Sequence, residues 1–177
     1  ATILAGLGTI ADVMPLVEEN RALAALALRG LPGSKMPGLR ALLLESGHGP
    51  DDGPVHEEVI QFQLAPRINA LGRFGSPMPA VELLTSVDTG PDGVRASTTL
   101  AREITSVNLQ RREAERAIVE EAITRAEAEG QTADDHPVIV LADPGWKRGL
   151  VGPACAKLVD RFARPVILFE ACDDGIA

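Results

Sequence analysis

The chain is poor in aromatic residues, which make up only 3% of its 177 residues: one Trp, four Phe and no Tyr. A core with so few aromatics must be built from Leu, Val, Ile and Ala. Proteins that bind single-stranded nucleic acid by stacking its bases use aromatic side chains. The composition therefore gives little support to binding by base stacking.

Cysteines and long apolar runs are also scarce. The two cysteines, Cys155 and Cys172, lack metal-ligand spacing, and we expect both to be reduced core residues of a cytoplasmic protein. No apolar run is long enough for a membrane span, and no secretion signal is visible. The sequence has no initiator Met and opens in an apolar run, so we expect an internal fragment.

Basic residues are outnumbered, with 17 Lys and Arg against 25 Asp and Glu and a formal net charge of −8. This balance argues against broad binding of phosphate backbones, although a focused basic cleft is compatible with it. Residues 61–75, QFQLAPRINALGRFG, carry Arg67, Asn69 and Arg73 and no acid. We interpret this segment as a local anion site; the alternative is a loop that caps a helix and leaves its arginines in solvent.

The first half of the chain reads as one strand followed by short helices. Residues 2–7 predict the end of a buried strand. The next helices are expected to end at Gly30 and Gly47, and another to be halted by Pro66. The predicted helices cover residues 20–29, 37–46, 56–64 and 79–85, with a loop at 47–54.

The second half predicts a long helix and a βαβ unit. Residues 94–129 contain neither Gly nor Pro, so one helix is expected over 93–129, about 55 Å long at 1.5 Å per residue. We expect it to connect two domains of a monomer; a coiled-coil dimer is the alternative. Strands at 138–142 and 166–170 flank a helix at 149–163. The predicted apolar seam of the long helix is Leu100, Ile104, Val107, Arg111, Ala114, Ile118 and Ala122.

Two places could carry chemistry. Asp12 follows the predicted first strand, where a carboxylate is well placed to bind Mg²⁺ or Mn²⁺; the alternative is a turn or cap residue. The turn at 143–149 could offer backbone amides to a phosphate at the start of the next helix, with charge from Lys147 and Arg148; the alternative is an ordinary turn. The three histidines are expected to be surface residues.

Three segments together resemble one family. Residues 8–16, GTIADVMPL, with Glu19-Asn20-Arg21 after them, resemble the last metal-binding motif of the DHH phosphoesterases. Residues 62–73, FQLAPRINALGR, resemble the motif that follows it in the RecJ-type single-strand-specific exonucleases. Residues 145–152, GWKRGLVG, resemble the DHHA1-domain motif, with Lys147 where the family usually has His. The order of the three segments is that of the family.

The resemblance implies an α/β fold and a 5′→3′ exonuclease acting on single-stranded DNA in recombination and repair. The fold would comprise the end of a DHH-type α/β domain (1–90), a long connecting helix (91–131) and the start of a DHHA1-type α/β domain (132–177). Two Mn²⁺ or Mg²⁺ ions would be cofactors. Asp12 would be a catalytic metal ligand, and the residues expected along the DNA path are Arg67, Asn69 and Arg73.

Two alternative functions remain open at this point. One is a DHH phosphodiesterase acting on cyclic dinucleotides or short oligonucleotides, and the other is a nucleic-acid-binding module without catalysis. The segment 66–73 favours the exonuclease, because it is a RecJ-type feature. The Asp-His-His motif of the family is absent from the chain, so we expect the chain alone to be inactive.

Overall fold

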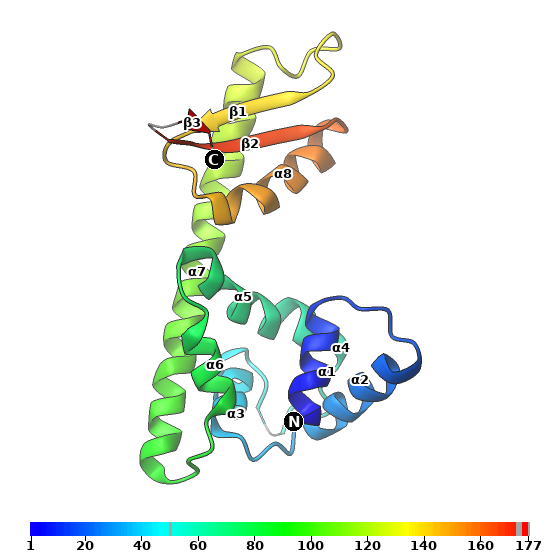
Figure 1. The fold of residues 1–177 in the computed structure, drawn as a ribbon, viewed down its shortest axis with the longest axis vertical. Helices are drawn as coiled ribbons and strands as arrows, with labels where there is room; N and C mark the ends of the chain where they lie inside the picture. Colours follow the sequence, from blue (N-terminus) through cyan, green and yellow to red (C-terminus); the bar gives the residue numbers. More distant parts are fainter. Residues whose placement is uncertain (50, 173–174, 177) are drawn as a thin grey trace. The chain divides into compact units, whose positions relative to one another are not determined.

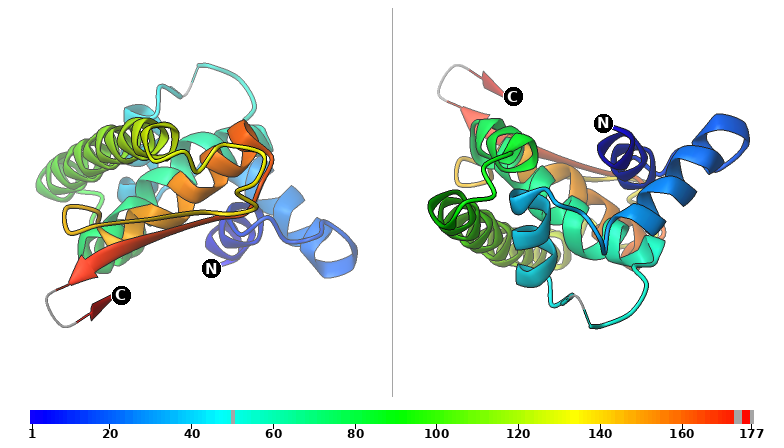
Figure 2. Two further views of the ribbon diagram at one scale, coloured as in Figure 1. Left: turned by 90° about the horizontal axis from the view of Figure 1, so that it is seen from above. Right: turned by 90° about the horizontal axis from the view of Figure 1, so that it is seen from below.

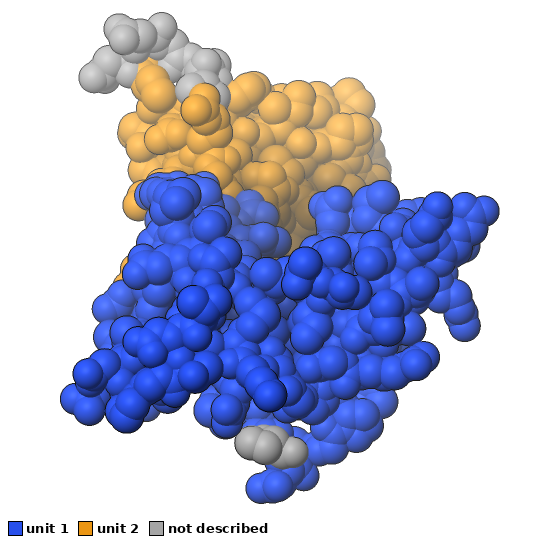
Figure 3. Space-filling view, turned by 60° about the horizontal axis from the view of Figure 1, so that its bottom comes forward, with its two compact units in different colours: residues 1–108 blue, residues 109–177 orange. Residues whose placement is uncertain are grey.

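A computed structural model describes residues 1–49, 51–172 and 175–176. The chain divides into two compact units, residues 1–108 and 109–177, which Figure 3 shows in different colours. The boundary between them falls within one continuous helix, α7 (Pro91–Ala128). Each unit is described by itself below. In the described part of the chain, no helix combines the length and the hydrophobicity needed to cross a membrane.

The described elements of unit 1 are all helical (Figures 1 and 2). Their buried face is aliphatic, as the composition predicts, with Ile10, Leu42, Ile60 and Ile104 almost fully buried. Besides the first part of α7, the helices are α1 (Thr2–Ala11), α2 (Glu18–Gly30), α3 (Pro37–Glu45), α4 (Glu57–Val59), the π-helical turn η1 (Ile60–Leu64), α5 (Ala65–Phe74) and α6 (Met78–Thr85).

The predicted strand at residues 2–7 is wrong, since these residues belong to α1. A short apolar run does not by itself distinguish a buried strand from a buried helix. The helix is favoured by its packing on α2, where Gly6 has no side chain to keep the two helices apart. A Cβ atom at Gly6 would lie 2.3 Å from the carbonyl oxygen of Leu23 and 2.5 Å from the Cβ of Ala27.

Residues 61–75 are not a loop, and Pro66 does not halt a helix. The turn η1 leads directly into α5, and Pro66 is the second residue of α5. The stretch from Glu57 to Phe74 is helical without a break, so Pro66 lies inside it and removes one backbone hydrogen bond. The π-helical turn directly before Pro66 is the local irregularity with which the helix continues past it. Single π-helical turns within a helix occur frequently at functional sites.

The long helix is confirmed, with bounds Pro91–Ala128 against the predicted 93–129. Its predicted seam is buried or half-buried throughout, and Ile104, Ile118 and Ala122 are at most 5% exposed. Polar side chains also lie on the buried side, among them Asn108 and Glu115. The apolar periodicity gives no indication of them.

Unit 2 contains the predicted parallel βαβ unit. Strand β1 (Ile139–Asp143) pairs in parallel with β2 (Val166–Cys172), and α8 (Arg148–Phe162) connects them and packs on β2 (Figure 1). A short antiparallel strand, β3 (Gly175–Ile176), follows on the other side of β2. The sequence also predicts a strand end that enters a turn at residues 174–177, of which the structure describes only Gly175 and Ile176.

One side-chain amide covers the free edge of β1. The N–H of Val140 donates to Oε1 of Gln131 over 2.7 Å, and Nε2 of Gln131 donates to the carbonyl oxygen of Val140 over 3.0 Å. This is the pair of hydrogen bonds that a residue on a neighbouring strand would make.

The prediction that both cysteines are core residues is wrong. Cys172 is exposed at the end of β2, and Cys155 on α8 is half-buried. Both are free thiols. Burial raises the pKa of the Cys155 thiol above its usual value, which keeps it protonated and makes it a poor metal ligand.

Candidate metal-ligand and nucleic-acid site

Unit 1 contains a groove between α1 and α5 that brings two of the predicted site residues together. It has a volume of about 340 Å³ and is lined mainly by aliphatic side chains, with Asp12 and Asn69 as its polar residues. Asp12 follows the last turn of α1, and Asn69 lies in the middle of α5. The groove therefore joins two of the three segments that carry the family resemblance, residues 8–16 and 62–73.

Asp12 lies at the end of the helix α1. The prediction that it follows a strand is therefore wrong. Its backbone N–H donates to the carbonyl oxygen of Gly8 over 3.0 Å, the N–H of Val13 donates to that of Ile10 over 3.1 Å, and Asp12 itself is exposed. The next residue, Val13, has a φ of 54°, which is strained for a β-branched side chain. Strained backbone of this kind tends to cluster at ligand sites.

The loop after Asp12 is held by a side chain from α2. Nδ2 of Asn20 donates to the carbonyl oxygen of Pro15 over 3.1 Å. Because Asn20 belongs to the segment Glu19-Asn20-Arg21, this hydrogen bond links the two parts of the motif. Asn20 positions the loop that continues from the candidate ligand.

The described residues do not form a metal centre by themselves. No three His, Cys, Asp or Glu side chains in the described part of the chain are close enough to hold one ion. A two-metal site needs several carboxylates or imidazoles, whereas the α1–α5 groove offers the single carboxylate of Asp12. The chain alone therefore does not fit a two-metal centre.

Arg67 is anchored inside unit 1. From its place on α5, its guanidinium donates to the carbonyl oxygen of Gln63, to that of Glu45 over 3.2 Å, and to Oγ1 of Thr105 over 3.3 Å. These acceptors lie on η1, α3 and α7. Arg67 therefore ties three helices to α5.

Asn69 and Arg73 are placed differently. Asn69 is exposed, and Arg73 is half-buried in the last turn of α5. A cation in this turn interacts favourably with the negative end of the helix dipole. Asn69 therefore lines the same groove as Asp12, whereas the guanidinium of Arg67 donates its hydrogen bonds to residues within unit 1.

Side-chain contacts of Trp146 and Asp143 attach the turn between β1 and α8 to α7. These contacts were not predicted from the sequence. Nε1 of Trp146 donates to Glu121 over 3.0 Å, and the guanidinium of Arg125 lies 5.5 Å from the centre of the Trp146 ring. Arg125 also donates to Asp143 over 3.2 Å. The spacing of Glu121, Arg125 and Glu129 is the only sequence signal for this network, because residues four apart meet on a helix.

The start of α8 already has an anionic partner. The N–H of Arg148 donates to a carboxylate oxygen of Glu170 over 3.0 Å. This N–H is one of the backbone donors that were expected to bind a phosphate. A phosphate there would compete with a carboxylate of the chain itself, so this turn is the weaker of the two candidate sites.

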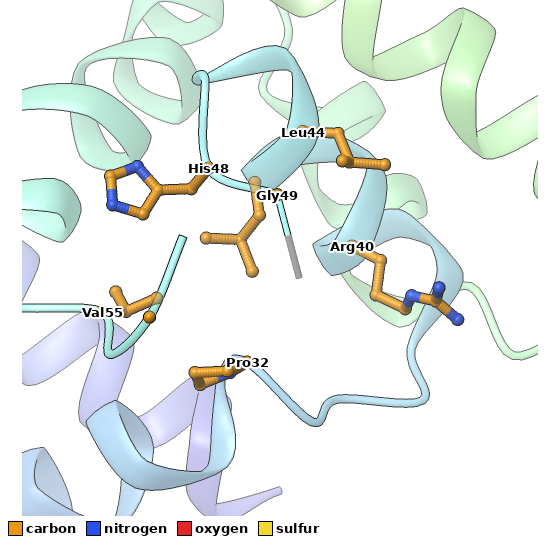
Figure 4. A pocket seen from close by; sticks show the side chains of 8 residues that line it. Pro32, Arg40, Leu44, His48, Gly49 and Val55 are labelled. Atoms are coloured by element: carbon orange, nitrogen blue, oxygen red, sulfur yellow. The ribbon is translucent and has the colours of Figure 1, made fainter. Parts of the chain in front are cut away.

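The histidines do not contribute a ligand cluster. His48 lines a small pocket of about 30 Å³, where Figure 4 shows its ring on the opposite side from Arg40. The space is sufficient for about one water molecule. His56 and His136 are exposed, as predicted for surface residues.

Comparison with known proteins identifies the family. No family model matches the chain. Its sequence is 43% identical over 175 residues to the single-stranded-DNA-specific exonuclease RecJ of Bacillus subtilis, a match that covers 98% of the chain and 21% of the relative. RecJ of Escherichia coli is 33% identical over 97% of the chain and 29% of the relative. The chain thus spans between a fifth and a third of these relatives.

Solved structures agree with the sequence comparison. The crystal structure of RecJ from Thermus thermophilus in complex with Mn²⁺ matches 95% of the chain and 24% of its own length, with a TM-score of 0.79 and 32% identity. The structure of exonuclease RecJ bound to manganese covers 94% of the chain and 39% of its own length, with a TM-score of 0.76. Sequence and fold together show that this chain belongs to the RecJ family.

Proposed function

We propose that this chain is part of an exonuclease that hydrolyses single-stranded DNA from its 5′ end with Mn²⁺ or Mg²⁺ as cofactor. One observation carries the proposal. Asp12 and Asn69, from two separate motifs, line one groove in a chain that matches named single-stranded-DNA-specific exonucleases over nearly all its length. The role in recombination and repair and the cytoplasmic location belong to the same proposal.

Within this groove each residue has a role that suits its chemistry. Asp12 supplies a hard carboxylate ligand to a metal ion, and the amide of Asn69 hydrogen-bonds the DNA strand. Outside the groove, in the last turn of α5, the guanidinium of Arg73 contacts a phosphate. Arg67, with three acceptors inside unit 1, acts chiefly by holding α5 in place. The remaining metal ligands come from parts of the longer protein outside this chain.

The domain assignment is part of the same proposal. We assign residues 1–90 to a DHH-type domain, 91–131 to a connecting helix and 132–177 to a DHHA1-type domain. Its support is that the boundary between the two compact units falls within α7. We expect the protein to be a monomer.

The substitution Asp12→Asn tests the proposal in the full-length protein. An amide is similar in shape to a carboxylate but is a far poorer ligand for a hard cation. The rate of nucleotide release from single-stranded DNA with Mn²⁺ should fall at least about a hundredfold. The melting temperature of the metal-free protein should not fall, since Asp12 caps the C-terminus of α1 through its backbone N–H, which Asn retains, and a negative charge at that end of a helix is not stabilising.

The control is Asp160→Asn, which removes an exposed carboxylate on α8 and should leave the rate unchanged. Substrates labelled at the 5′ or the 3′ end report the polarity of digestion. The 177-residue chain alone should release no nucleotides. A near-normal rate for Asp12→Asn would refute the assignment of Asp12 as a metal ligand.

A further inference from the structure

Unit 2 contains a second groove that no proposed role has used. It lies between α7 and α8, has a volume of about 730 Å³ and is lined mostly by charged side chains. We refer to it as the α7–α8 groove. Its four cations are Arg111, Arg112, Arg116 and Lys157.

A buried carboxylate fixes two of these cations. The side chain of Glu115 is 8% exposed and accepts from Arg111 and from Lys157, each over 2.7 Å. Burying a carboxylate is costly unless its charge is compensated. Glu115 therefore serves to join α8 to α7 and to hold Arg111 and Lys157 at one margin of the groove.

The other two cations are differently placed. Arg112 and Arg116 are exposed, and among the described residues neither has a hydrogen-bond or ion-pair partner. They are one turn apart on α7, about 6 Å along its axis. In a chain with a net charge of −8, two adjacent exposed arginines without a partner form a local positive site.

Helical geometry places the remaining acids of the groove on one side of its exposed arginines. At about 100° per residue, Arg112 and Arg116 lie within about 40° of each other around α7. Glu113 and Glu120 lie roughly 100° and 80° from Arg112, on the side away from Arg111 and Glu115, and form an acidic margin. They are neighbours of Arg116, three residues before it and four after it, so the excess of positive charge is greatest at Arg112.

We propose that the α7–α8 groove binds the phosphate backbone of single-stranded DNA through Arg112 and Arg116. This inference rests on the proposed function, since it assigns a second contact for the same substrate outside the α1–α5 groove. The acidic margin keeps the strand on the side of Lys157. The contact is electrostatic, so it is independent of base sequence and weakened by salt.

Binding of a fluorescent oligothymidine to the 177-residue chain in EDTA, measured by anisotropy over a range of salt concentrations, tests this proposal without any cleavage step. The double variant Arg112→Ala/Arg116→Ala should bind about tenfold more weakly at low salt. Its log–log salt slope should fall by about 1.4, or 0.7 for each lost phosphate contact on a single strand. The lysine pair Arg112→Lys/Arg116→Lys should keep most of the slope.

The matched control is Arg29→Ala/Arg95→Ala, which removes the same charge from two exposed arginines of unit 1. It should retain the wild-type slope, and thermal melts should show that all variants are folded. Three results would overturn the proposal: no binding by the wild-type chain, a wild-type slope in the double alanine variant, or an equal loss in the control. None of them bears on Asp12, whose test measures cleavage.

Discussion

Arg67 is a basic residue of a nucleic-acid motif whose hydrogen bonds are used inside the protein. We predict that Arg67→Ala lowers the free energy of unfolding by about 1.5–3 kcal/mol, because a charged donor with three acceptors is removed. Denaturant unfolding measures this change. The salt slope of single-stranded DNA binding should be unchanged.

Arg73 provides the comparison at the same scale. We predict that Arg73→Ala in the full-length protein reduces the salt slope by about 0.7 with a smaller loss of stability. Salt-titrated binding measured beside a thermal melt separates the two arginines. A stable Arg67→Ala variant with a reduced slope would show that Arg67 contacts DNA instead.

The candidate site could be predicted only partly at the level of single residues. Residue types and the family resemblance singled out Asp12 and Asn69, but the distance between them in the sequence gives no reason for them to share a groove. That proximity depends on the packing of α1 against the helices that follow. The anchoring of Arg67 could not be predicted either, because two of its acceptors are backbone carbonyls, which carry no sequence signal.

At the scale of elements, the crossing of α1 and α2 depends on one glycine. We predict that Gly6→Ala destabilises the protein by about 1–3 kcal/mol, since the new methyl group would overlap the backbone of Leu23. Gly8 is the matched control on the same helix, because a Cβ there meets nothing within 4 Å. Gly8→Ala should stabilise by about 0.5–1 kcal/mol. Urea midpoints that shift in the same direction for both variants would contradict the close approach.

The edge of β1 gives a second prediction at this scale. Gln131→Ala removes both hydrogen bonds to Val140 and should cost about 1–2 kcal/mol. It also leaves an unpaired strand edge, which favours association between chains. Light scattering at increasing protein concentration should show larger species for Gln131→Ala, whereas the exposed control Gln110→Ala should behave as wild type. A monodisperse Gln131→Ala variant would show that the edge is protected in another way.

Elements with a regular pattern and clear ends were predictable from the sequence. The long helix α7 lacks internal Gly and Pro, and β1, α8 and β2 alternate as a βαβ unit should. Predictions failed where tertiary packing decides. Residues 2–7 form a helix because Gly6 permits close packing on α2. The helix around Pro66 continues through the π-helical turn η1 that directly precedes the proline.

At the scale of the whole molecule, burial of the apolar seam of α7 by other parts of the same chain predicts a monomer. Ile104 and Ile118 are 1% and 5% exposed in the chain, so the same side chains are not available to a second helix. Sedimentation should therefore show one species of 18.6 kDa for this chain over a wide concentration range. A dimer whose formation strengthens with concentration would refute this expectation.

The two attachments of α7 within unit 2 have a consequence for changes in chain length. Glu115 joins this helix to α8 through Lys157, and Glu121 and Arg125 join it to the turn that contains Trp146. A deletion of one residue between Glu115 and Glu121 would rotate one attachment by about 100° relative to the other. Substitutions on the exposed side of this segment are therefore tolerated, whereas insertions and deletions are not: its length is as much a part of the fold as its sequence.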